Sequence, residues 1–160
     1  MVTINGLGGT RAGCTFRKAT LDDIPDIYWV ETLCLKDPWD CKTMIEMMTV
    51  FLTSFIVAEA DGRIIGFGAG AVEETGQEKY GHICNLAVSP EMRGLGIGRL
   101  LLRKLEREFF LKGCTACSLE VRTSNTSAHE FYERIGYEDV IVFSEYYADG
   151  EDAIVMMRWF

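Results

Sequence analysis

The feature that most constrains this sequence is a glycine-rich stretch between a short apolar segment and a long helical pattern. The apolar segment, residues 83–88, is predicted to be a strand that ends at Ser89-Pro90, because proline lacks the N–H that a sheet requires. The stretch itself is Arg93-Gly94-Leu95-Gly96-Ile97-Gly98-Arg99. Backbone N–H groups with no side chains around them, at the positive end of a helix dipole, attract phosphate groups. The stretch therefore predicts a phosphate-binding loop, with a flexible turn before a helix as the alternative.

Two common phosphate loops do not match the spacing of these glycines. The stretch lacks the Gly-Lys-Ser/Thr that ends a Walker loop. Its spacing is G-x-G-x-G rather than G-x-G-x-x-G, and no acidic residue follows at a strand end about 20 positions later, as a dinucleotide fold requires. The remaining pattern is Arg93-x-x-Gly96-x-Gly98 after a strand and a proline turn.

Composition indicates a globular protein and excludes some partners. Of 160 residues, 48% are hydrophobic and 25% are charged, which is enough for a full core. The net charge of −8 argues against nucleic-acid binding, which needs a basic face. It favours a cationic partner such as a protonated amine, or serves only solubility. The apolar run at 47–60 is interrupted by Thr49, Thr53 and Ser54, so no membrane binding is expected. The six cysteines are expected to be buried free thiols of a cytoplasmic protein.

Periodic apolar patterns predict one mixed α/β domain without internal repeats. Residues 1–13 carry four glycines and are expected to be a flexible leader, which leaves 14–160 as the domain. The predicted strands span residues 14–18, 54–60, 63–72, 83–88, 117–123, 139–144 and 153–159. The predicted helices begin at Thr20, Cys41, Ile97 and Ser124-Asn125, and end before Pro38, at Leu52, at Lys112-Gly113 and near Ile135. The acidic segment 73–79 is predicted to be a turn.

Four separated blocks resemble the GNAT acetyltransferase superfamily, in the order in which that family carries them. They are residues 85–88, the glycine-rich stretch, Leu119-Glu120-Val121-Arg122 with Asn125, and residues 131–137. The likeness is strongest to the protein N-terminal acetyltransferases, namely the ribosomal-protein-alanine enzyme and its archaeal relatives. Leu-Glu-Val-Arg-x-Ser-Asn at 119–125 and Tyr-Tyr-Ala-Asp-Gly-Glu-Asp-Ala at 146–153 carry it. The resemblance implies a mixed α/β fold, with a mostly antiparallel sheet of about seven strands flanked by about four helices.

The resemblance also implies a reaction, the direct transfer of acetyl from acetyl-CoA to the α-amine of a protein or peptide, with a ribosomal protein as one candidate. No metal is expected. The implied coenzyme site comprises Leu86, Ala87, Val88, Arg93, Gly94, Leu95, Gly96, Ile97, Gly98, Arg99 and Asn125. The strand at 86–88 is expected to splay from its neighbour, which frees a backbone N–H for the thioester oxygen as negative charge develops there.

Three residues are candidates for proton transfer. Glu120 matches the proton acceptor of the family, acting through water, and Tyr132 matches the proton donor to the CoA thiolate. Taken alone, Glu120 is better explained as a solvated charge on a strand and Tyr132 as a core aromatic, but together with the other matching blocks they favour the catalytic roles. His82 matches a histidine in the archaeal relatives, and its ordinary pKa of about 6.5 suits a base, but a structural role is equally open.

The acceptor side is implied by two short segments. Pro38-Trp39 and Tyr146-Tyr147 match residues that border the peptide groove in the family, although the tyrosines alone fit a hairpin turn. At pH 7 roughly a tenth of an α-amine is neutral, against less than a thousandth of a lysine amine, so a modest base suffices for the α-amine. The alternatives are acetylation of a small amine or a lysine side chain, and a CoA-sensing module without catalysis. A sensor has no need of an acid and a base.

Cys114-x-x-Cys117 is the main competing feature. The pair suits a redox site or half of a zinc site. The other potential ligands are scattered along the chain: Cys14, Cys34, Cys41, Cys84, His82 and His129. A plain junction between a loop and a strand is therefore preferred, with one thiol turned inward.

Overall fold

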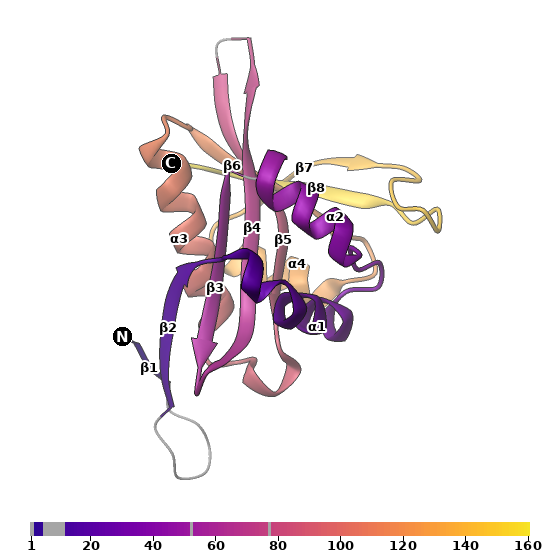
Figure 1. Cartoon of the computed structure of the whole chain (residues 1–160). Helices are drawn as coiled ribbons and strands as arrows, with labels where there is room; N and C mark the ends of the chain where they lie inside the picture. The colour runs from indigo at the N-terminus through magenta and orange to yellow at the C-terminus, as the bar shows by residue number, and fades with distance from the viewer. Residues whose placement is uncertain (1, 5–11, 52, 77) are drawn as a thin grey trace.

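The computed structural model describes residues 2–4, 12–51, 53–76 and 78–160, which contribute eight strands to one sheet (Figure 1). The strands are β1 (Val2–Ile4), β2 (Ala12–Lys18), β3 (Ser54–Ala60), β4 (Arg63–Thr75), β5 (Glu78–Val88), β6 (Ala116–Arg122), β7 (Glu138–Phe143) and β8 (Ala153–Trp159). Their order is β1-β2-β3-β4-β5-β6-β8-β7, and every neighbouring pair is antiparallel except β5 with β6. The predicted mixed, mostly antiparallel fold is confirmed, and β2 to β8 are its seven strands.

Four α-helices cover the two faces of the sheet. They are α1 (Ile24–Cys34), α2 (Cys41–Glu46), α3 (Ile97–Leu111) and α4 (Thr126–Arg134). Along β3, Phe55 and Val57 pack with α1, whereas Ile56 and Ala58 pack with α3. Because successive strand residues point to opposite faces, α1 and α3 lie on opposite sides of the sheet. Figure 1 shows α1 and α2 in front of the sheet and α3 and α4 behind it.

Glycines on the central strands allow α3 to pack closely. A Cβ at Gly81 of β5 would lie 2.2 Å from Phe109 Cδ2, and a Cβ at Gly70 of β4 would lie 2.7 Å from Phe109 Cζ. Neither position has room for a side chain while Phe109 occupies the core. The side chain of Phe109 is fully buried as a result.

Two differences from the sequence prediction concern strands. Residues 2–4 form β1, paired with 12–14, so the expected leader is wrong there. Three β-branched residues in a row, Val2-Thr3-Ile4, favour a strand over a loose segment. Residues 1 and 5–11 of that leader lie outside the described residues, and the domain limit at residue 14 stays a prediction.

The predicted turn at 73–79 is the second difference. β4 and β5 continue into it, with Glu73 opposite Tyr80 and Glu74 opposite Lys79, and Lys79 Nζ lies 2.6 Å from Glu74 Oε1. The acidic residues belong to a long hairpin that projects beyond the sheet in Figure 1, so they resemble a loop in composition only. Residue 77 lies outside the described residues.

The helices before β3 also differ from the prediction. A 3-10 turn (Leu21–Asp23) comes before α1, with a capping box between Thr20 and Asp23. The helix predicted over 41–52 ends at Glu46 and continues as a π-helical turn (Met47–Phe51). There Thr49 Oγ1 donates to the carbonyl of Ile45, at 2.8 Å. Residue 52 lies outside the described residues. In the part of the chain that the structure describes, no helix is long and apolar enough to cross a membrane.

Candidate active site

The site begins where β5 and β6 separate. The two strands pair in parallel at three positions only, from Tyr80 with Ala116 to His82 with Ser118. A bulge at Cys84 follows, since Ile83 faces Gly70 and Asn85 faces Ala69 on β4. Bulges bend a strand and increase its twist. Beyond the bulge β5 continues to Val88 paired with β4 alone, which confirms the predicted splay and leaves the β6-facing edge at 86–88 without a partner strand.

An open groove of about 630 Å³ lies beside this unpaired edge. It brings together ten of the eleven residues predicted for coenzyme binding, namely Leu86, Ala87, Val88, Arg93, Gly94, Gly96, Ile97, Gly98, Arg99 and Asn125. Leu95 is the exception, because it packs against the core instead of lining the groove. Tyr132 of α4 lines the same groove. The groove thus unites the glycine-rich stretch with a predicted catalytic residue.

The glycine-rich stretch places the N-terminus of α3 in the groove. Gly94 and Gly96 have φ of 76° and 81°, a conformation that other residues adopt only with strain. Gly96 is the N-cap of α3, and its carbonyl accepts the first helical hydrogen bond, from Leu100 N at 3.1 Å. The N–H groups of the first turn therefore have no partner within the helix and carry the positive end of its dipole. Such an arrangement can hold a pyrophosphate.

Helix α4 forms the opposite wall. Asn125 caps it through Oδ1, which accepts from Ala128 N at 3.2 Å. The ring of Tyr132 packs against Phe131 and Tyr137, with centroids 5.1 and 5.7 Å away. Burial raises the pKa of the Tyr132 phenol, so its hydroxyl keeps its proton at neutral pH, as a proton donor must.

Several lining residues were not predicted from the sequence. They are Cys34, Leu35, Met92, Ser127, Ala128, Phe131, Arg134 and Ile135. Ala128, Phe131, Tyr132 and Ile135 follow the i, i+3, i+4, i+7 spacing of one helix face. That spacing marks a face of α4 but does not distinguish a core from a groove.

His82 and Glu120 lie in direct contact beside the splay. His82 Nε2 is 2.7 Å from Glu120 Oε2, and His82 Nδ1 is 3.0 Å from Glu73 Oε1. The hydrogen bond with Glu120 raises the pKa of His82, against the lowering effect of burial. The Tyr80 hydroxyl donates to Glu73 at 2.7 Å and lowers the pKa of that carboxyl. Glu120 thus belongs to a hydrogen-bonded group rather than standing as a solvated charge.

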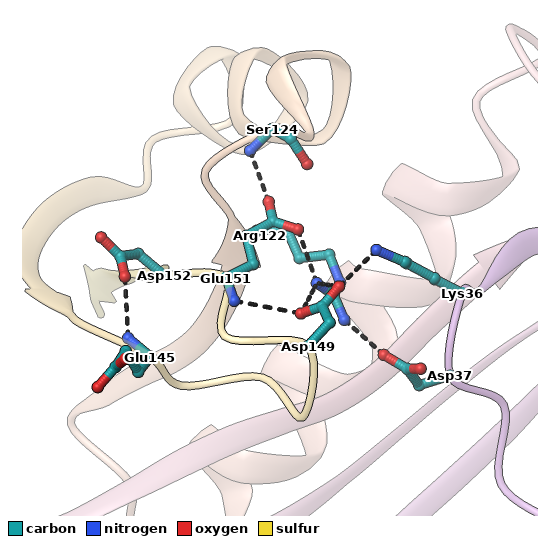
Figure 2. Close-up of polar contacts among 8 residues, drawn as sticks. All are labelled: Lys36, Asp37, Arg122, Ser124, Glu145, Asp149, Glu151 and Asp152. Carbon is teal, nitrogen blue, oxygen red and sulfur yellow. Dashed lines mark hydrogen bonds and ion pairs between the residues drawn. The ribbon is translucent and has the colours of Figure 1, made fainter.

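The two predicted substrate segments belong to loops that meet at Arg122 (Figure 2). We call Lys36, Asp37, Arg122, Asp149 and Glu151 the Arg122 cluster. Arg122 Nη1 lies 2.7 Å from Glu151 Oε2 and 3.1 Å from Asp149 Oδ1, and Nη2 contacts Asp37. Lys36 also contacts Asp149. The cluster therefore ties loop 35–40, which carries Pro38 and Trp39, to loop 144–152.

The tyrosines of loop 144–152 pack against each other beside the Arg122 cluster. The Arg122 guanidinium lies 3.8 Å from the centroid of the Tyr147 ring, a cation–π contact. Tyr146 packs edge-on against Tyr147 at 5.1 Å. Burial raises the pKa of Tyr146, and the nearby carboxylates of Glu120 and Glu73 raise it further. Tyr146 therefore keeps its proton at neutral pH.

A buried glutamate that was not predicted from the sequence anchors Trp39. Glu31 of α1 is 0% exposed, and its Oε1 accepts from Trp39 N at 3.2 Å and from Asn85 Nδ2 at 2.8 Å. Burial raises its pKa to about 7. This carboxyl joins the substrate loop to β5 one residue before Leu86. Its spacing from Ile24 and Ile27 on the buried face of α1 was the available signal.

Cys114 and Cys117 are both buried, and burial raises the pKa of both thiols. All six cysteines are free, but Cys41 is exposed, so the expectation of burial is wrong for it. Residues 2–4, 12–51, 53–76 and 78–160 contain no group of three or more His, Cys, Asp or Glu placed to hold a metal.

We expect the Cys114→Ala/Cys117→Ala variant to keep its acetyl-CoA affinity and to contain no stoichiometric zinc. Calorimetry and metal analysis measure this, and a metal that is lost with these thiols would contradict it.

Known proteins are similar to this chain over most of its length. A family model described as Acetyltransferase (GNAT) family matches residues 22–137. An uncharacterised N-acetyltransferase of Methanocaldococcus jannaschii is 39% identical over 143 residues, which cover 89% of each protein. The N-alpha-acetyltransferase of Sulfurisphaera tokodaii is 33% identical over 151 residues, which cover 88% of this chain and 89% of that protein. The crystal structure of the ribosomal-protein-S18-alanine N-acetyltransferase from Escherichia coli matches with a TM-score of 0.78 and 28% identity, over 91% of this chain and 92% of that one. The chain therefore belongs to the GNAT family and is an acetyl-CoA-dependent N-acetyltransferase.

Proposed function

We propose that the acetyl acceptor is the α-amine at the N-terminus of a protein or peptide. The observation that carries the proposal is the place of Glu120, which is hydrogen-bonded to His82 and followed on β6 by Arg122, the residue that holds the loop of Tyr146 and Tyr147. An amine that enters beside this loop meets a carboxylate within a proton-transfer group. The names of the S. tokodaii and E. coli relatives support the same acceptor class.

The proposed reaction assigns each step to residues of this chain. An amine that arrives as an ammonium ion loses a proton to Glu120 through a water molecule. Its nitrogen then bonds to the acetyl carbon, and the unpaired backbone N–H groups at 86–88 stabilise the negative carbonyl oxygen. The carbon–sulfur bond breaks, Tyr132 protonates the thiolate, and the second nitrogen proton restores Tyr132. The sum is R–NH3+ + CH3CO–S–CoA → R–NH–CO–CH3 + CoA–SH + H+.

A peptide panel tests the acceptor. Peptides with different first residues, alanine among them, are incubated with acetyl-CoA and the protein, and mass spectrometry locates the acetyl group. We expect acetylation of the α-amine. Controls are the same peptides with a blocked N-terminus and an internal lysine, and a polyamine. Transfer to the blocked peptides or the polyamine alone would replace the proposal by a lysine or small-amine activity.

Asp149→Asn is expected to raise the KM for the peptide about two- to tenfold without changing the KM for acetyl-CoA. Asp149 joins Lys36 to Arg122, so its loss loosens both loops that flank the acceptor, and the effect is modest because solvent screens exposed ion pairs. Added salt should raise the wild-type KM in the same direction, because it screens the cluster.

Steady-state kinetics at low and high salt measure this effect. Glu145→Gln is the matched control, since Glu145 is an exposed carboxylate of the same loop outside the Arg122 cluster. Identical salt dependence in wild type and Asp149→Asn would show that the cluster does not position the peptide.

A further inference from the structure

The hydrogen-bonded chain at the splay extends beyond the residues that act on substrate in the proposed reaction. From Glu120 it passes through the two ring nitrogens of His82 to Glu73 Oε1, over contacts of 2.7 and 3.0 Å. The other Glu73 oxygen accepts from the Tyr80 hydroxyl at 2.7 Å. Glu73 lies on β4, Tyr80 and His82 on β5, and Glu120 on β6. Three neighbouring strands thus contribute to one continuous chain.

Both ring nitrogens of His82 face a carboxylate oxygen, which stabilises the imidazolium that forms when a neutral ring takes up a proton. A neutral imidazole has one donor and one acceptor nitrogen, so it satisfies only one of two carboxylates. The imidazolium donates to both. A neutral ring with its proton on Nδ1, toward Glu73, can take a proton at Nε2 from a protonated Glu120 and then release the Nδ1 proton.

The solvent exposure of the side chains increases along this series of hydrogen bonds, from Glu120 on the substrate side to Glu73 at the β4–β5 hairpin. The side chains of Glu120 and His82 are 19% and 23% exposed, whereas that of Glu73 is 44% exposed. Glu73 stands where the β4–β5 hairpin leaves the sheet. Two other titratable groups are Cys84, whose Sγ lies 3.8 Å from the carbonyl oxygen of His82, and Tyr146 of loop 144–152, and burial raises the pKa of both. They are therefore neutral at pH 7, which leaves Glu73 as the acceptor on the solvent side.

We propose that Glu73 is the outlet of a proton relay that carries the acceptor's proton from Glu120 through His82 to solvent. The proposal rests on the acetyl transfer proposed above. Glu120 receives a proton from the ammonium ion and passes it to His82 Nε2. His82 enters the turnover as the neutral ring with its proton on Nδ1, so uptake at Nε2 makes it an imidazolium. Nδ1 then gives its proton to Glu73 Oε1, and Glu73 releases it to water. Exchange with water moves the remaining ring proton from Nε2 back to Nδ1 before the next turnover. One proton enters and one leaves, which is the net proton of the reaction.

Glu73→Gln tests the outlet with little change in shape. A glutamine carbonyl still accepts a hydrogen bond from His82 Nδ1, so the ring keeps its place, but an amide cannot carry the proton onward. We expect kcat to fall about ten- to a hundredfold, at or below the lower end of the 10²–10⁴-fold range of a group that acts on substrate directly. Glu74→Gln is the matched control, because Glu74 is the next residue and pairs with Lys79 on the outside of the hairpin. It should keep the wild-type rate.

Two further readouts separate a relay from a structural role. Small buffer bases such as formate or imidazole should restore kcat of Glu73→Gln in proportion to their concentration, because the site of Glu73 is open to solvent and a base there can accept the proton of His82 Nδ1. They should leave the wild-type rate unchanged. The loss of one carboxylate should also lower the pKa of His82, so the acidic limb of the pH–rate profile should move to lower pH.

The outcomes distinguish this proposal from the acceptor class. The variants are assayed with whichever amine the wild type acetylates, since every ammonium acceptor must lose the same proton. A normal rate in Glu73→Gln, or a loss that no buffer restores, would overturn the relay and leave the acceptor class standing. Acetylation of a polyamine alone, with buffer rescue of Glu73→Gln, would overturn the N-terminal acceptor and support the relay. A wild type that acetylates no amine would overturn both.

Discussion

Glu120→Gln is expected to lower kcat by about 10²–10⁴-fold while the affinity for acetyl-CoA stays unchanged. The glutamine carbonyl can still accept from His82 Nε2, but it cannot take the proton of the ammonium ion. The hydrogen bond with Glu120 is the largest effect that raises the pKa of His82, so the variant should also titrate this histidine at lower pH. Mass spectrometry of samples quenched at timed intervals measures the rate of acetyl transfer, and NMR of the imidazole measures the pKa of His82.

Tyr132→Phe is the companion variant on the other wall. It removes the hydroxyl that protonates the thiolate and keeps the ring that packs on Phe131 and Tyr137, so folding should be unaffected. A loss of rate in the same range is expected. Glu78→Gln and Tyr28→Phe serve as controls away from the groove. Normal rates in both variants, with an acidic limb that follows the amine pKa of each peptide, would show that the amine arrives neutral from solvent.

The coenzyme half of this site could be predicted from the sequence because its determinants are local. The positive φ angles of Gly94 and Gly96, the break at Pro90 and the helix that follows all lie within one short segment. The groove lies at the point where β5 separates from β6. Leu95 shows the limit of the motif, since its side chain packs against the core while the other residues of the stretch line the groove.

The acceptor half depends on contacts between distant segments. Arg122 and Asp37 are 85 positions apart, and Glu31 and Asn85 are 54 apart, so neither pair has a sequence spacing to recognise. Glu73 could not be predicted from the sequence for another reason. Its acidic neighbours resemble a turn in composition, whereas the pairing of β4 with β5 makes it a strand residue opposite Tyr80. The pairing of β4 with β5 places Glu73 opposite Tyr80, and this strand pairing cannot be deduced from a single sequence.

Gly98→Val is expected to weaken acetyl-CoA binding by about a hundredfold or more, equivalent to about 2.8 kcal/mol. A Cβ at this position would lie 3.6 Å from both Phe131 Cζ and Val88 Cγ2, which line the groove from opposite sides. The two further methyl groups of valine therefore enter the space between them. Calorimetry measures the affinity, and circular dichroism should stay native-like, because Gly98 has an ordinary helical backbone.

Alanine substitutions at Gly98 and Gly96 distinguish an effect on the groove from an effect on the backbone conformation. Gly98→Ala keeps ordinary contacts and should stabilise α3 by up to about 0.5–1 kcal/mol, yet weaken acetyl-CoA binding, because its methyl group narrows the groove. Gly96→Ala should destabilise the protein by about 1–2 kcal/mol, since its φ is 81°, while no atom of the residues that the structure describes lies within 4 Å of the added Cβ. Thermal unfolding and calorimetry on both variants give four values. Unchanged affinity for acetyl-CoA in both Gly98→Ala and Gly98→Val would place the pyrophosphate elsewhere. A ligand in contact with this turn of α3 would bind more weakly in at least one of the two variants.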